Sequence, residues 1–168
     1  MLKLYRIKNN LIRYFLVSVV MLLVSSITYS QINKVPPFQM MQANGKVFLA
    51  GNLPVGKPIV IIYFSPDCKE CHDLTTELLK RINEFSTASI AMITNMPLDQ
   101  VKQFVSEFQL EKYPNIYVGT EGDSFFVGRY YRVGKLPFMV LHNKNGDLVK
   151  VYNQEMNIED LILRLKGL

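Results

Sequence analysis

The sequence feature that most constrains the fold is a pair of cysteines, Cys68 and Cys71, set between a strand pattern and a helix pattern. They are the only two cysteines of the chain. Residues 59–64 form an unbroken apolar run rich in β-branched side chains, typical of a strand buried on both faces of a parallel sheet. Beyond Pro66, apolar side chains recur every three or four positions as far as Phe85, and this period predicts a helix. The cysteines are therefore expected at a strand-to-helix junction.

The start of this helix is expected at the cysteines, with Asp67 as the N-cap and Glu70 three positions later, as in a capping box. Cys68 would then occupy the first helical position. There the unpaired backbone N–H groups and the positive end of the helix dipole stabilise an anion, and so favour a cysteine thiolate. Cys71 follows one helical turn later, within disulfide range of Cys68. The pair is therefore predicted to cycle between a dithiol and a disulfide.

This region resembles the thioredoxin superfamily, and within it the extracytoplasmic TlpA/ResA-like thiol-disulfide oxidoreductases. The matching pieces are residues 56–58 (Gly-Lys-Pro), the Cys68-x-x-Cys71 motif, and Leu136-Pro137 followed by a second apolar run and an Asn-Gly turn. The resemblance covers roughly residues 37–167. The CxxC motif between a strand and a helix comes first, and the Leu-Pro with its strand and Asn-Gly turn follows about 65 residues later, as in the family. It implies an α/β thioredoxin-like fold, with a central mixed sheet flanked by helices and an N-terminal β-hairpin extension.

The resemblance also implies roles for individual residues. Cys68 would be the exposed attacking thiol and Cys71 the buried resolving thiol. The peptide bond between Leu136 and Pro137 would be cis, so that the backbone of Leu136 could hold an extended substrate strand beside Cys68. Without the resemblance, Pro137 reads only as an acceptable first residue of a strand. No metal is implied, and no cofactor other than the redox-active disulfide Cys68–Cys71.

Charged residues around Cys68 are expected to tune its reactivity in opposite directions. Lys69 and the helix dipole stabilise a thiolate, whereas Asp67 and Glu70 oppose it, and the sequence leaves the net effect open. Asp67 also replaces the tryptophan that commonly precedes the first cysteine in the family. Phe138 similarly replaces the threonine that often follows the cis-proline.

The carboxylates that exchange a proton with the resolving cysteine in relatives are missing from this chain. Ile62 and Leu74 stand at the two corresponding positions. Asp73, Glu77 or water are left as candidates for this proton transfer.

The rest of the chain supplies alternating strand and helix patterns, which predict right-handed crossovers and a parallel sheet. The expected elements are a hairpin turning at Asn44-Gly45, a strand at 89–94, a helix at about 97–108, a short strand or extended segment at 113–118, a hairpin turning at 144–147 and a helix at 158–166. Residues 123–131 are ambiguous between a short helix and a loop, and the resemblance favours the helix.

The N-terminal segment has the pattern of an export signal. Four cations and no acid accompany an apolar run of about 14 residues, and small residues stand at the −3 and −1 positions before Gln31. The run is shorter than the roughly 20 residues that span a bilayer. We expect residues 1–30 to be a signal peptide, or an anchor if uncleaved, and residues 31–168 to be one thioredoxin-like domain. The protein would be exported, to the periplasm or the outer face of the cytoplasmic membrane.

The charge distribution excludes a nucleic-acid partner. The net charge is +5, but residues 31–168 carry 15 basic against 14 acidic side chains. The expected partners are instead disulfide-bearing exported proteins and a thiol-type electron donor in the membrane. Membrane contact is expected only through the N-terminal segment, if it is uncleaved. The predicted activity is reduction of exported disulfides by a mixed-disulfide mechanism.

Two other functions stay open on the sequence. One is a redox-inactive binding module that uses the groove beside Pro137 for a peptide or a metal-handling partner. The other is a peroxiredoxin-like peroxidase, whose PxxxTxxC pattern is incomplete here: Ser65 supplies a hydroxyl, but Ile61 stands in place of the proline.

A structural zinc site is disfavoured because zinc takes four ligands. Only Cys68, Cys71 and His72 are close in sequence, and His142 is distant. His72 is interpreted as a surface residue and His142 as a structural one.

Overall fold

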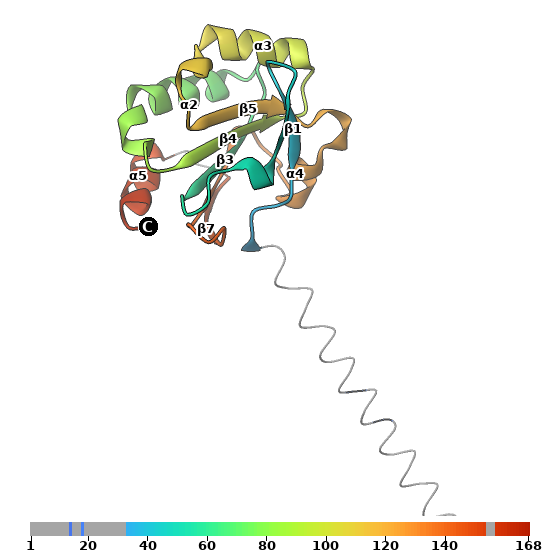
Figure 1. The fold of residues 1–168 in the computed structure, drawn as a ribbon, viewed down its shortest axis with the longest axis vertical. Coiled ribbons are helices and arrows are strands. Elements are labelled where there is room, and N and C mark those ends of the chain that lie inside the picture. Colours follow the sequence, from blue (N-terminus) through green and yellow to red (C-terminus); the bar gives the residue numbers. More distant parts are fainter. Residues whose placement is uncertain (1–13, 15–17, 19–32, 154–156) are drawn as a thin grey trace, which may run out of the picture. The chain divides into compact units, whose positions relative to one another are not determined.

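A mixed sheet organises the residues that the computed structural model describes, which are 14, 18, 33–153 and 157–168 (Figure 1). Residues Lys34–Leu168 form one compact unit. The predicted signal peptide at 1–30 lies outside the described residues, apart from positions 14 and 18. No helix in the described part of the chain is long and apolar enough to cross a membrane.

The sheet has seven strands in the spatial order β2-β1-β5-β4-β3-β6-β7. Strand β3 pairs in parallel with β4, and β4 in parallel with β5, whereas β6, β7, β1 and β2 join antiparallel. The strands are β1 (Gln39–Gln42), β2 (Val47–Leu49), β3 (Ile59–Tyr63), β4 (Ser89–Thr94), β5 (Ile116–Thr120), β6 (Phe138–His142) and β7 (Leu148–Tyr152). The predicted central mixed sheet and N-terminal hairpin are confirmed.

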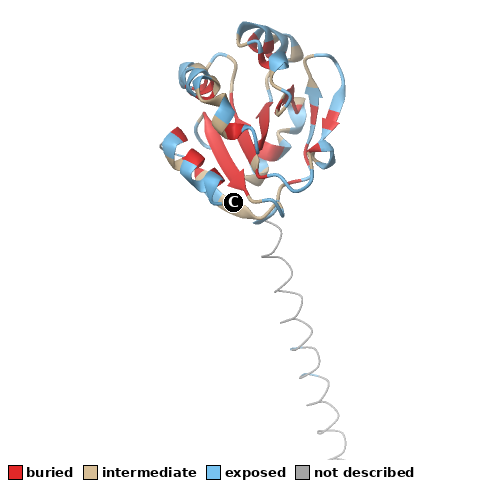
Figure 2. Ribbon diagram, turned by 60° about the vertical axis from the view of Figure 1, so that its left-hand side comes forward, coloured by how far each residue is buried: buried red, intermediate tan, exposed pale blue. Residues whose placement is uncertain are grey.

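Both faces of the sheet are covered, which explains why its central strands carry unbroken apolar runs (Figure 2). Alternate residues of β3 point to opposite cores: Ile62 packs with the helices of one face, and Tyr63 with the hairpin and the short helix of the other. The helices are α2 (Lys69–Lys80), α3 (Leu98–Glu107), α4 (Phe126–Tyr130) and α5 (Ile158–Lys166). Helices α2, α3 and α5 bury their apolar stripes in the first core and α4 in the second.

Two boundaries differ from the sequence prediction. The apolar period from Cys71 to Phe85 is divided into α2 and a 3-10 turn, Ile82–Phe85. Strand β5 starts at Ile116 and runs to Thr120, later than expected, because its last residues pair with β1 of the hairpin. That pairing requires Gly119, since a Cβ there would lie 2.7 Å from the backbone oxygen of Met41.

The segment after β5, ambiguous in sequence, folds into α4 around a buried carboxylate. Glu121 accepts a hydrogen bond of 2.8 Å from the hydroxyl of Tyr63 and another of 2.8 Å from the backbone N–H of Val127. The first bond spans 58 positions of sequence. It fixes the start of α4 to the end of β3.

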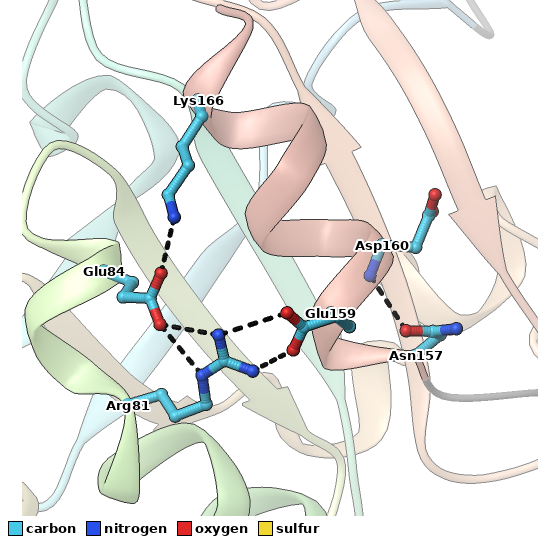
Figure 3. Close-up of polar contacts among 6 residues, drawn as sticks. All are labelled: Arg81, Glu84, Asn157, Glu159, Asp160 and Lys166. Carbon is cyan, nitrogen blue, oxygen red and sulfur yellow. Dashed lines mark hydrogen bonds and ion pairs between the residues drawn. The ribbon is translucent and has the colours of Figure 1, made fainter.

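A group of ion pairs attaches α5 to the end of α2 (Figure 3). Arg81 contacts Glu159 of α5 and lies 2.6 Å from Glu84, whose other oxygen is 2.8 Å from Lys166. The helix itself is capped by Asn157, whose side-chain oxygen accepts from the N–H of Asp160 at 2.8 Å. We call Arg81, Glu84, Glu159 and Lys166 the α5 clamp.

Candidate active site

The first cysteine caps the helix that follows it. Cys68 has extended backbone angles and is the N-cap of α2, with its sulfur accepting from the N–H of Cys71 at 3.3 Å. The expectation that Asp67 would cap and that Cys68 would be the first helical residue is therefore wrong. A tight turn, closed by the Cys68 N–H on the Ser65 carbonyl at 3.1 Å, puts the sulfur where the capping oxygen was expected. The sulfur of Cys68 thus occupies the anion position of the helix start.

The second cysteine is buried and the first is partly exposed. Cys71 is 1% exposed and packs in the core beneath α2, among apolar side chains that include Ile62 and Leu74. Burial raises the pKa of the Cys71 thiol far above its usual range, and the hydrogen bond with Cys68 adds to this. Both cysteines are free thiols. The two sulfurs lie close together with opposite access to solvent.

Of the three residues expected to tune the pair, Glu70 contacts a sulfur. The Cys68 thiol donates to Oε2 of Glu70 at 3.6 Å, and the negative charge of Glu70 also helps to raise the pKa of Cys71. The ammonium group of Lys69 donates a hydrogen bond to Oδ2 of Asp73 at 2.6 Å, and Asp67 is exposed to solvent. The carboxylate beside the thiols is therefore Glu70.

The other candidates for proton transfer lie elsewhere on α2. Asp73 is paired with Lys69, and both Asp73 and Glu77 are exposed. The sequence predicted Glu70 as a capping-box residue and a tuning charge, but not as a proton-transfer group. Its place directly before the resolving cysteine was the available signal.

The bond between Leu136 and Pro137 is cis, as the resemblance implied. Pro137 is buried just ahead of β6, and Phe138 pairs with Tyr63, the last residue of β3. The cis bond therefore lies at the sheet edge from which the cysteine loop leaves. Leu136 and Cys68 are both partly buried against the same core. Within the described residues, no hydrogen bond engages the backbone of Leu136.

His72 is a tether between three elements, which sequence reasoning missed. Its Nε2 donates to the Pro66 carbonyl at 2.5 Å, and its Nδ1 lies 3.3 Å from a carboxylate oxygen of Glu107 in α3. The ring packs edge-on against Phe104 and Phe108 at centroid distances of 5.3 and 5.2 Å. His72 is therefore half-buried and holds the loop before Cys68 against α3.

His142 is far from this site. It pairs with Ile59 at the opposite end of β3 from Tyr63, and its ring is bound by the Tyr131 hydroxyl at 2.7 Å and the Gly146 carbonyl at 3.0 Å. Burial lowers its pKa. The interpretation of His142 as structural is confirmed. Among the residues that are described, no group of three or more His, Cys, Asp or Glu side chains could hold a metal ion.

A partly exposed cysteine capping a helix, its buried neighbour one turn later, and a cis-proline at the same sheet edge define a thioredoxin-fold protein with a dithiol site. The family model described as Thioredoxin matches residues 39–131, more than half of the chain. The chain therefore belongs to the thioredoxin family, as the resemblance predicted. No curated protein sequence matches it.

Solved structures share the fold over most of their length. A secreted Mycobacterium tuberculosis disulfide oxidoreductase homologous to E. coli DsbE has a TM-score of 0.65 and 21% identity, over 79% of this chain and 96% of that one. Peroxidoxin BcpB of the same bacterium has a TM-score of 0.67 and 14% identity, over 80% and 95%. Copper-bound ScoI of Arabidopsis thaliana has a TM-score of 0.62 and 22% identity, over 80% and 96%. At such identities the likeness establishes the fold alone.

Proposed function

We propose that this protein is an exported thiol-disulfide oxidoreductase that reduces disulfides of exported proteins through Cys68 and Cys71. The observation that carries the proposal is the asymmetry of the pair. Cys68 is partly exposed at a helix start that favours an anion, whereas Cys71 is buried beside it with a raised pKa. An attacking thiol needs access to solvent and a stabilised thiolate, and a resolving thiol needs to lie beside it, out of reach of external disulfides.

The reaction is two successive thiol-disulfide exchanges. The Cys68 thiolate attacks one substrate sulfur, an S–S bond forms between them, and the other substrate sulfur leaves and takes up a proton. Cys71 then gives up its proton and attacks the Cys68 sulfur, which releases the second substrate sulfur as a thiol. Two electrons and two protons pass to the substrate, and the enzyme keeps a Cys68–Cys71 disulfide. A dithiol donor in the membrane reduces that disulfide and is itself oxidised.

Two further residues take part in this scheme. Glu70 contacts the Cys68 thiol at 3.6 Å and acts electrostatically on Cys71, so it is the carboxylate we assign to the proton exchanges. The backbone of Leu136, ahead of the buried cis-proline Pro137, is assigned to hold an extended strand of the substrate.

The proposed site of action is the periplasm or the outer face of the cytoplasmic membrane. The export pattern of residues 1–30 supports it. A similar fold in a secreted disulfide oxidoreductase is consistent with it.

The test is a redox assay on purified residues 31–168. We expect the protein to reduce insulin and to form a Cys68–Cys71 disulfide in glutathione buffers, observed by mass spectrometry. A protein that does neither would contradict the proposal. The midpoint of the same glutathione titration places the pair among reductants or oxidants.

A redox-inactive binding module is the second candidate, favoured by the backbone of Leu136 beside the cis-proline, which has no hydrogen-bond partner within the described residues, and by the fold shared with copper-bound ScoI. It predicts that no disulfide exchange occurs through Cys68. A peroxidase is the third candidate, because the peroxidoxin BcpB shares the fold. It predicts that the protein consumes hydroperoxide and that Cys68 is the first cysteine to be oxidised.

A further inference from the structure

A hollow of about 320 Å³ lies between the loop before Cys68 and helix α3. Its walls include Pro66 and Asp67 of the loop and His72 of α2 on one side, and Gln100, Gln103 and Glu107 of α3 on the other. Asp67 is the chain neighbour of Cys68, so the hollow opens one residue from the attacking sulfur. A side chain next to the substrate cysteine that bonds to Cys68 can therefore extend into it.

The hollow offers more hydrogen-bond acceptors than donors. The oxygen Oε1 of Gln100 is buried and has no hydrogen-bond partner within the described residues. Asp67 is exposed, and the side chain of Glu107 is 51% exposed with one oxygen 3.3 Å from His72. Two carboxylates and one imidazole thus line the hollow, and the Nε2–H of that imidazole already donates to the Pro66 carbonyl. An occupant must bring donors and positive charge.

We propose that the hollow binds a lysine or arginine side chain that flanks the cysteine attacked by Cys68. The inference rests on the proposed function and adds a substrate preference to it. A long cationic side chain can enter the hollow and bring its donors to Glu107 and Gln100. The charges would raise the rate of productive encounter without changing the exchange chemistry itself.

The test compares two short peptides, each closed by an internal disulfide, that differ only in carrying Lys or Glu on both sides of the attacked cysteine. The intact protein should reduce the Lys peptide with a kcat/KM roughly two- to fivefold higher, the range of partly exposed ion pairs. The ratio should approach one in high salt. Glu107→Gln and Gln100→Leu should each lower the ratio. Because the readout is the ratio of kcat/KM for the two peptides, a change in the reactivity of Cys68 that affects both peptides equally leaves the ratio unchanged.

The matched control is Glu111→Gln, which removes the same charge from an exposed residue just after α3 that does not line the hollow. It should keep the wild-type ratio. Equal rates for the two peptides, or an unchanged ratio in Glu107→Gln, overturn the inference while the disulfide reductase proposal stands. Reduction of neither peptide overturns the inference, and it overturns the reductase proposal as well only if insulin is not reduced and no Cys68–Cys71 disulfide forms. A glutathione titration separates these outcomes, because it involves no peptide.

Discussion

At the scale of single residues, the reactivity of the site depends on two groups that form hydrogen bonds with the Cys68 sulfur. The N–H of Cys71 donates to it at 3.3 Å and stabilises the thiolate. The Glu70 carboxylate accepts from it at 3.6 Å and stabilises the protonated thiol. Lys69, which the sequence suggested as a balancing cation, is engaged by Asp73. Glu70 is therefore the side chain whose charge opposes attack.

Replacing Glu70 with Gln should separate two properties of the site. Loss of the carboxylate should speed alkylation of Cys68 by iodoacetamide at neutral pH, by roughly two- to tenfold, because the thiolate is no longer opposed. If Glu70 also exchanges protons with Cys71, the resolving step should slow, and mixed disulfides should last longer. Stopped-flow alkylation and trapping with a disulfide peptide measure the two effects. Slower or unchanged alkylation would contradict the role of the Glu70 contact.

The raised pKa of Cys71 makes a separate prediction. In a Cys68→Ser variant, burial still favours the neutral thiol, so alkylation of Cys71 should stay slow at neutral and mildly alkaline pH. The sign for stability follows from the same shift. The unfolded chain loses this proton first as the pH rises, so the contribution of Cys71 to stability falls above its ordinary pKa of 9.0. Alkylation of Cys71 as fast as that of an exposed thiol would refute its buried environment.

At the scale of elements, the sequence predicted what local patterns determine. The apolar run of β3, the stripe of α2 and the turns at Gly45 and Gly146, both with positive φ, are local and were found as expected. Contacts between distant side chains were not predictable, because packing of the whole domain selects them, and the His72–Glu107 tether is of this kind. The capping of α2 by the Cys68 sulfur is local, but it depends on the tight turn closed on Ser65, which shifts the helix start by one residue.

The attachment of the hairpin to the sheet should depend on Gly119. An alanine there would place Cβ 2.7 Å from the Met41 backbone oxygen, so β1 and β5 would have to separate. We expect Gly119→Ala to lower the free energy of unfolding by about 1–3 kcal/mol. Gly51→Ala is the matched control, because no atom lies within 4 Å of its added Cβ. Urea denaturation that gives equal losses for both would show that the close approach does not matter.

The α5 clamp should make stability depend on pH. Hydrogen bonds from Lys166, then Arg81, lower the pKa of Glu84, and a hydrogen bond from Arg81 lowers that of Glu159. The stabilisation is therefore fully present above their ordinary value of 4.5 and is lost as the pH falls through the lowered values. Arg81→Gln should lower the Tm at pH 7 and do so less in acid.

The control for the clamp is Lys80→Gln, which removes a neighbouring exposed cation outside it. Differential scanning calorimetry at both pH values compares the two variants. A loss of Tm in Arg81→Gln that is the same at neutral and acid pH would contradict an electrostatic clamp.

At the scale of the whole molecule, the thioredoxin fold brings together pieces that are distant in the chain. The cysteines follow β3 and the cis-proline precedes β6, and the antiparallel pairing of these strands puts both at one edge of the sheet. The resemblance predicted this arrangement, whereas Pro137 by itself predicted only the first residue of a strand. The hollow lined by Asp67 had no signal in the sequence, since α3 contributes to it only through packing on α2.

The most direct measurement of the central claim is trapping of mixed disulfides in cells. With Cys71 replaced by Ser, the substrate should stay bonded to Cys68, and non-reducing gels with mass spectrometry should find exported proteins joined to that sulfur. With Cys68 replaced by Ser, the buried Cys71 should trap none. Equal trapping by both variants, or none by the Cys71→Ser variant, would contradict an exposed attacking thiol with a buried resolving partner.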